Sequence, residues 1–153
     1  MKKISKRSLN TSGGIVMHDD KKILFIVKKN KWDLPKGKIG HNRTQLNTAI
    51  EEIHEETGLK KKDLKVVKKL VPTYYFKNID GENLLKKTTW FLFDFTGDLN
   101  SPLIPETKEN ITHCEWITID DIDKIFKNTH ERIKYIIDLF LVDLKNSKKI
   151  TNQ

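Results

Sequence analysis

The sequence has a single cysteine, Cys114, and no apolar stretch of the roughly 18 residues that a transmembrane helix needs. One cysteine excludes an internal disulfide. The N-terminal segment is basic but lacks the apolar core of a secretory signal. A lone cysteine without an export signal is typical of a reducing compartment, so we expect a cytoplasmic protein with no membrane contact.

Charge, by contrast, is plentiful and unbalanced. The 153 residues carry 29 basic and 21 acidic side chains, which gives a formal net charge of +8. This balance favours polyanionic ligands such as nucleotides and RNA. The lysines are scattered along the chain, so a general compositional bias is the alternative to a dedicated nucleic-acid surface. The length fits one domain with its own hydrophobic core.

One predicted helix carries three carboxylates on a single face. Glu52, Glu55 and Glu56 stand at positions i, i+3 and i+4, which an α-helix brings together. Thr44 is placed to cap the start of this helix, and Gly58 is placed to end it. An apolar stripe beside the carboxylates, suited to a core, is formed by Leu46, Ala49, Ile50 and Ile53.

Like charges at this spacing destabilise a helix, so the acidic stripe calls for a physical reason. A bound cation would supply one, because hard cations such as Mg²⁺ bind carboxylate oxygens together with substrate phosphates. The alternative is a solvated acidic face, since glutamates are common on protein surfaces.

Residues 37–59 resemble the signature of the Nudix hydrolases, G-x5-E-x7-R-E-U-x-E-E-x-G-U, in which U is aliphatic. The positions that match at the required spacings are Gly37, Glu52, Ile53, Glu55, Glu56, Gly58 and Leu59. The preceding WDLPKG, residues 32–37, is similar to the lead-in of many family members. Two positions differ, because Arg43 replaces the first glutamate of the signature and Glu51 replaces its arginine.

The resemblance implies an α+β fold, the Nudix α/β/α sandwich with a mixed β-sheet and a catalytic loop-helix-loop. We expect a single Nudix domain over residues 12–144. A basic flexible tail at 1–11 and a polar tail at 145–153 would flank it. Dimers are common in the family, so a homodimer is an alternative to a monomer.

The resemblance also implies a Mg²⁺-dependent pyrophosphohydrolase, with Mn²⁺ as the alternative cation. Its substrate would be a nucleoside diphosphate linked to another group. The metal ligands implied by the match are the Gly37 carbonyl, Glu52, Glu55 and Glu56. In this interpretation Glu55 or Glu56 is a ligand that can also act as the general base.

Nudix proteins often supply one more carboxylate from the loop before a tryptophan-bearing strand. Here that loop is residues 97–110, and the predicted strand, 111–117, carries Trp116. Glu109 is our first choice for this catalytic carboxylate on its spacing to Trp116, and Glu106 is the second. The alternative is that both are surface residues.

Two kinds of side chain are candidates for contact with substrate. Lys36 and Lys38 flank Gly37 and could meet phosphates as point charges, unless they are simply exposed lysines. The aromatic candidates are Trp32, Tyr74 and Trp90. Aromatic rings stack on nucleobases, but they more often fill a core.

Tyr74 and Trp90 belong to a predicted hairpin. Its strands are residues 64–76, in which Pro72 marks a bend or an edge, and residues 84–95. The Asp80-Gly81 dipeptide is a strong signal for the turn between them.

The lead-in WDLPKGK is similar to branches that act on dinucleoside polyphosphates and on diphosphoinositol phosphates. We therefore predict cleavage of a phosphate-rich small molecule, with a dinucleoside polyphosphate first. Other small-molecule substrates left open are ADP-ribose, other nucleotide sugars and damaged nucleoside triphosphates. A further alternative is an RNA 5′-pyrophosphohydrolase, and another is a catalytically weak module that binds a nucleotide. The exchange of Arg43 and Glu51 is the best support for the weak module, unless the two side chains still attract each other.

Overall fold

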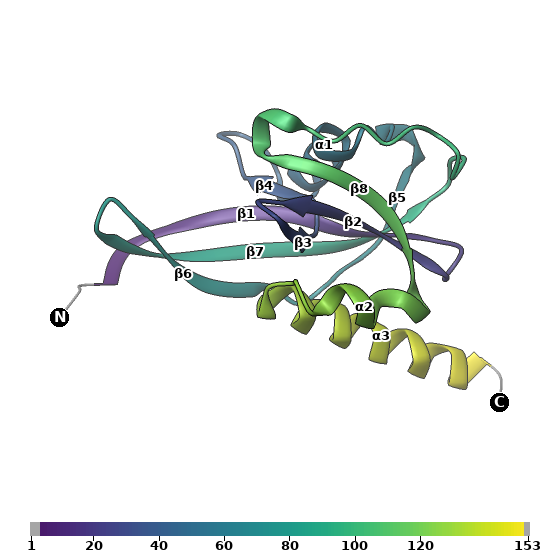
Figure 1. Cartoon of the computed structure of the whole chain (residues 1–153). Helices are drawn as coiled ribbons and strands as arrows, with labels where there is room; N and C mark the ends of the chain where they lie inside the picture. The colour runs from purple at the N-terminus through teal and green to yellow at the C-terminus, as the bar shows by residue number, and fades with distance from the viewer. Residues whose placement is uncertain (1–3, 152–153) are drawn as a thin grey trace.

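Eight strands of the computed structural model pair into one sheet, and helices cover both of its faces (Figure 1). The structure describes residues 4–151. The strands are β1 (Ile4–His18), β2 (Lys22–Lys28), β3 (Lys31–Asp33), β4 (Lys36–Lys38), β5 (Leu64–Lys69), β6 (Thr73–Ile79), β7 (Glu82–Phe95) and β8 (Ile111–Thr118). The helices are α1 (Gln45–Thr57), α2 (Ile122–Phe126) and α3 (Glu131–Thr151), with short 3₁₀ turns η1 (Lys61–Asp63), η2 (Thr107–Glu109) and η3 (Ile119–Asp121).

The sheet is mixed, as predicted. Its main path is β3-β2-β1-β7-β5, while β4 pairs with β1, β6 with β7 and β8 with β2. The central β1–β7 pair is parallel, and every other pair is antiparallel. In Figure 1, α1 lies above the sheet and α2 and α3 lie below it, which confirms the predicted α/β/α sandwich.

Two hydrophobic cores separate the layers, because alternate residues of a strand point to opposite faces. Ile15 of β1 packs toward α2 and α3, whereas its neighbour Val16 packs toward α1. The core on the α3 side includes Phe25, Leu34, Trp90, Ile133 and Ile137. The core on the α1 side includes Leu24, Ala49, Ile53, Phe91 and Phe93.

Local signals fix both ends of α1. The Thr44 side chain accepts a hydrogen bond from the Asn47 N–H at 3.0 Å, which satisfies a free donor in the first turn. Gly58 adopts the left-handed conformation, with φ of 80°, and donates its N–H to the His54 carbonyl. The predicted caps are confirmed, so the acidic face of α1 is held in a defined place.

The predicted hairpin differs from the observed one in one detail. The segment expected as one strand over residues 64–76 is two strands, β5 and β6, with Pro72 between them. Proline cannot donate to a strand ladder, which explains the break. Asp80 and Gly81 both have positive φ, as the predicted turn between β6 and β7 requires.

Strand β1 and helix α3 extend into the two segments predicted as tails. β1 begins at Ile4, and residues 8–17 pair with β7 along its length. This pairing to a distant strand orders residues whose own composition favours a loose segment. At the other end α3 continues to Thr151, so residues 145–151 are helical. Residues 1–3 and 152–153 lie outside the described part of the chain.

No helix in the described part of the chain combines the length and the apolar character that a membrane span requires.

Candidate active site

The backbone of β4 lies directly against the acidic face of α1. A Cβ atom built at Gly37 would fall 2.0 to 2.4 Å from the carboxylate atoms of Glu52. Only glycine leaves room for this approach. The start of α1 is also tied to the sheet, because the Ser12 hydroxyl donates to the Gln45 carbonyl at 2.7 Å.

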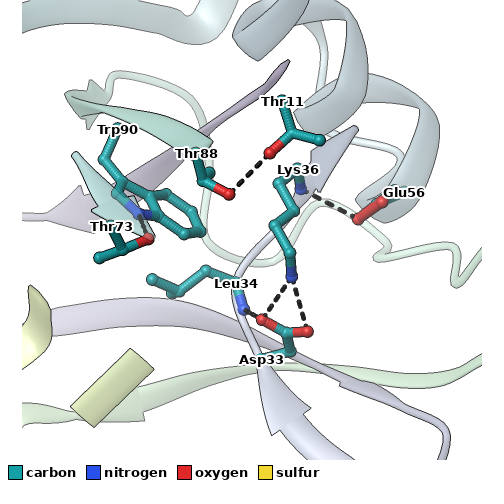
Figure 2. Close-up of polar contacts among 8 residues, drawn as sticks. All are labelled: Thr11, Asp33, Leu34, Lys36, Glu56, Thr73, Thr88 and Trp90. Carbon is teal, nitrogen blue, oxygen red and sulfur yellow. Dashed lines mark hydrogen bonds and ion pairs between the residues drawn. The ribbon is translucent and has the colours of Figure 1, made fainter. Parts of the chain in front are cut away.

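Glu56 is the most buried of the predicted ligands. Its Oε2 accepts a hydrogen bond from the Lys36 backbone N–H at 3.3 Å (Figure 2). Burial raises the pKa of the Glu56 carboxyl to about 8, in spite of the opposing charges of Lys36 and Lys28. A cation bound beside Glu56 would stabilise the ionised carboxylate, which burial otherwise disfavours.

Glu52 lies close enough to other acidic side chains to feel their negative charge. Burial raises the pKa of its carboxyl to about 7, and the charges of Glu55, Glu106 and Glu109 add to the shift. Burial also raises the pKa of Glu106, followed by the charges of Glu109 and Glu55. The structure therefore brings the loop acids to the carboxylates of α1, from a segment some fifty residues further along the chain.

The sequence did not predict that a basic residue, Lys28, faces this acidic cluster. Lys28, the last residue of β2, is half-buried and opposes the charge of Glu52, Glu56 and Glu106. It pairs with Ile111 of β8, immediately after the acidic loop. The register between β2 and β8 could not be predicted from the sequence, and that register is what brings Lys28 to the site.

Comparisons with known proteins identify the family. A model of the NUDIX domain matches residues 9–140. The chain belongs to the Nudix family. This match confirms the recognised signature and the predicted enzyme class, a Nudix hydrolase.

Among curated Nudix relatives, the RNA pyrophosphohydrolase of Pelagibacter ubique is 26% identical over 148 residues, covering 84% of this chain and 93% of that protein. The RNA pyrophosphohydrolase of Bartonella henselae is 30% identical over 121 residues, covering 72% of this chain and 67% of that protein.

Solved structures support the Nudix fold. A C. elegans Ap4A hydrolase binary complex superposes with a TM-score of 0.70 at 17% identity, covering 90% of this chain and 98% of that one. A bifunctional NMN adenylyltransferase/ADP ribose pyrophosphatase from Francisella tularensis also gives 0.70, at 20% identity, with coverage of 91% and 42%.

The exchanged signature residues, Arg43 and Glu51, form no ion pair with each other in the described part of the chain. A hydrogen bond from Lys61, together with the charges of Lys61 and then Arg43, lowers the pKa of the Glu51 carboxyl and outweighs the opposing effect of burial. Its direct partner is the Lys61 ammonium, from the turn η1. The charge of Arg43 therefore still attracts Glu51, but the cation in direct contact with the Glu51 carboxylate is Lys61.

The structure corrects the role predicted for Lys36. Its ammonium lies 2.8 and 2.7 Å from the two carboxylate oxygens of Asp33, and both side chains are buried (Figure 2). It is therefore engaged inside the protein and is not presented to a phosphate. Lys38 is exposed, and its contact with phosphate stays a prediction.

Trp90 is also corrected, from a stacking residue to a core residue. Its side chain is 1% exposed, and its Nε1 donates to the Thr73 hydroxyl at 2.9 Å (Figure 2). The reason is its side of the strand, which faces α3. Trp32 is half-buried, with its ring edge-on to His113, so no more than part of it can meet a substrate.

Tyr74 lies on an open surface, and its contact with a substrate stays a prediction. It is 54% exposed and forms part of the wall of a cavity of about 810 Å³ between β6 and the start of α3. The lining residues are Pro72, Thr73, Tyr74, Tyr75, Glu131, Arg132 and Tyr135. The sequence did not predict a role for α3 in this wall.

Proposed function

We propose that this Nudix hydrolase is a divalent-cation-dependent pyrophosphohydrolase of nucleotide-linked polyphosphates, with a dinucleoside polyphosphate as the first substrate class. The observation that carries the proposal is the approach of the Gly37 backbone to Glu52, beside Glu55 and Glu56 on the same helix. Carboxylates and a backbone carbonyl from a single loop and helix make an all-oxygen donor set.

That donor set fits Mg²⁺ or Mn²⁺, because hard cations prefer oxygen ligands. The raised pKa values of half-buried Glu52 and buried Glu56 support the fit, since the positive charges beside them do not offset the cost of burying the ionised carboxylates. Within residues 4–151, no three acidic, histidine or cysteine side chains already converge as ligands. Glu55 is exposed, so we expect its side chain to rearrange when a cation binds.

The cation would neutralise pyrophosphate oxygens and acidify an attacking water. The chain's own residues have three tasks. Glu52 and Glu56 are fixed by their packing against Gly37 and Lys36 and serve as ligands. Glu109 is exposed in the loop facing them and is our choice for the base that takes the water proton, with Glu55 second. Lys28 and Lys38 supply positive charge for the phosphates.

The experiment that tests this proposal is a hydrolysis panel with and without Mg²⁺. The substrates are diadenosine tetraphosphate, diguanosine tetraphosphate, ADP-ribose, a diphosphoinositol phosphate and a 5′-triphosphorylated RNA. We expect Mg²⁺-dependent cleavage of the dinucleoside polyphosphates, resolved by chromatography. Nucleotide binding without cleavage of any member would contradict the proposal and favour the binding module.

A second candidate, removal of pyrophosphate from an RNA 5′ end, is supported by the relatives. Both curated relatives described above are named RNA pyrophosphohydrolases. This candidate predicts that the RNA is cleaved faster than the dinucleotides. It also predicts that affinity rises with RNA length and falls steeply with salt, because each phosphate contact releases counterions.

A further inference from the structure

Arg132, in the first turn of α3, lines the cavity between β6 and α3 and packs against an aromatic ring. Its guanidinium lies over the ring of Tyr75, with the central carbon 3.8 Å from the ring centroid. The Lys86 ammonium lies over the same ring at 5.4 Å. Stacking on Tyr75 therefore fixes the plane of the guanidinium, and that plane forms part of the cavity wall.

One donor of Arg132 has no acceptor. Its Nε is buried, and within the described chain it is the one buried side-chain nitrogen or oxygen that lacks a hydrogen-bond partner. A ligand in the cavity cannot reach this buried Nε, so the donors that it can meet are the terminal amino groups of the guanidinium.

The lining of this cavity also includes two exposed aromatic side chains. Tyr74 is 54% exposed and Tyr135 is 55% exposed, and both line the same cavity. The volume of about 810 Å³ is ample for a nucleobase with its ribose. A planar ring with acceptor atoms on its edge would meet both features, by stacking on a tyrosine and by accepting from the guanidinium.

Residues 32–36 lie between the carboxylates and the start of α3, because Trp32 donates its backbone N–H to the Asn128 carbonyl at 3.0 Å. Lys36 donates its backbone N–H to Glu56, and its ammonium pairs with Asp33. The positive charge of Arg132 contributes to the lowered pKa of Asp33. The positive charge of Lys36 likewise contributes to the lowered pKa of Tyr75. A nucleotide could therefore leave its phosphates at the carboxylates and carry its base into the cavity.

We propose that Arg132 determines base specificity and selects guanine over adenine, an inference that rests on the proposed hydrolysis of nucleotide-linked polyphosphates. Guanine presents two acceptors, O6 and N7, on one edge, and the arginine fork matches them with two parallel hydrogen bonds. Adenine replaces O6 with an amino donor, which faces the guanidinium donors unfavourably. Tyr74 and Tyr135 hold the plane of the ring.

The test compares diguanosine and diadenosine tetraphosphate in the wild type, in Arg132→Gln and in Arg132→Lys. We expect the wild type to show a KM about tenfold lower for the guanine substrate. In Arg132→Gln this preference should disappear through a rise in KM, with kcat changed by less than about twofold because the phosphates and carboxylates are untouched. Arg132→Lys keeps the charge but not the planar fork, and it should lose the preference as well.

Two controls separate recognition from general damage. Lys145→Gln removes one positive charge from an exposed position on the same helix and should behave as the wild type. A diphosphoinositol phosphate has no base, so if the wild type cleaves it, the Arg132 variants should cleave it equally well. Thermal melting of each variant checks that it remains folded.

An unchanged ratio of KM values in the Arg132 variants would overturn the inference. An equal loss on the base-free substrate would also overturn it, because Arg132 would then contact phosphate. If the wild type cleaves no substrate, the proposed function fails, but calorimetric binding of GMP and AMP still decides the inference. Tighter GMP binding that Arg132→Gln abolishes supports it, and equal binding of both nucleotides rejects it.

Discussion

Lys36 connects the interior of the protein to the site through two different groups of the same residue. Its backbone N–H orients Glu56, while its ammonium is neutralised by Asp33 in the interior. Burial by itself would raise the pKa of the Asp33 carboxyl. The charge and hydrogen bonds of Lys36 and the N–H of Leu34 outweigh it, so the pKa lies below its ordinary value of 3.8. This ion pair therefore anchors the segment that carries Gly37.

The first prediction concerns this pair and the stability of the protein in acid. Because the pKa of Asp33 is lower in the folded than in the unfolded chain, its stabilising contribution is complete above 3.8 and is lost as the pH falls through the folded value. Asp33→Asn should lower the free energy of unfolding at neutral pH by about 3–5 kcal/mol, since it leaves the Lys36 ammonium buried and unpaired. The free energy of unfolding of Asp33→Asn should also change less with pH in the acidic range than that of the wild type.

Urea unfolding at neutral pH and near pH 3 measures both effects. Asp33→Asn combined with Lys36→Met removes both charges, and its loss at neutral pH should be much smaller than that of the single change. A urea midpoint for Asp33→Asn equal to that of the wild type would show that the pair does not stabilise the fold.

At the scale of elements, the site depends on how β4 meets α1. The sequence predicts α1 accurately because its signals are local, with Thr44 capping one end and Gly58 terminating the other. It does not predict that residues 4–11 join β1 or that Lys28 faces the acids, because both depend on pairing with distant strands. For the same reason the sequence leaves Trp90 a candidate for either the substrate or the core, since its side of the sheet is decided by packing against α3.

The second prediction concerns the contact between these two elements. In Gly37→Ala the new methyl group would displace the Glu52 carboxylate, which is the flexible end of its side chain. We expect stability to change by less than about 1 kcal/mol. Activity should fall about 100-fold, because misplacing one site group by about 1 Å is enough for such a loss.

Gly40→Ala is the matched control. It lies in the same loop, and its new Cβ would make an ordinary contact of 3.5 Å with Arg43. Turnover and thermal melting of the two variants should be measured together. If Gly37→Ala retains full activity, Glu52 does not need its place against β4.

At the scale of the molecule, the sandwich divides the work between its two helical layers. The layer of α1 carries the acids, and the layer of α3 carries Arg132 and Tyr135 at the cavity. The fold class and the acidic helix α1 could be predicted because a contiguous signature encodes them. The cavity could not, because it joins β6 to a helix more than fifty residues further along, and no local pattern records their packing.

The central claim, that the buried acids of α1 drive the hydrolysis, is tested most directly by Glu56→Gln. The measurement is kcat for a dinucleoside tetraphosphate at saturating Mg²⁺, beside the wild type and the exposed control Glu115→Gln. Glutamine has nearly the same shape and needs no charge in a buried position, so the variant should stay folded. We predict a loss of about 1,000-fold for Glu56→Gln and none for the control. A Glu56→Gln protein within a few-fold of the wild-type rate would contradict the account.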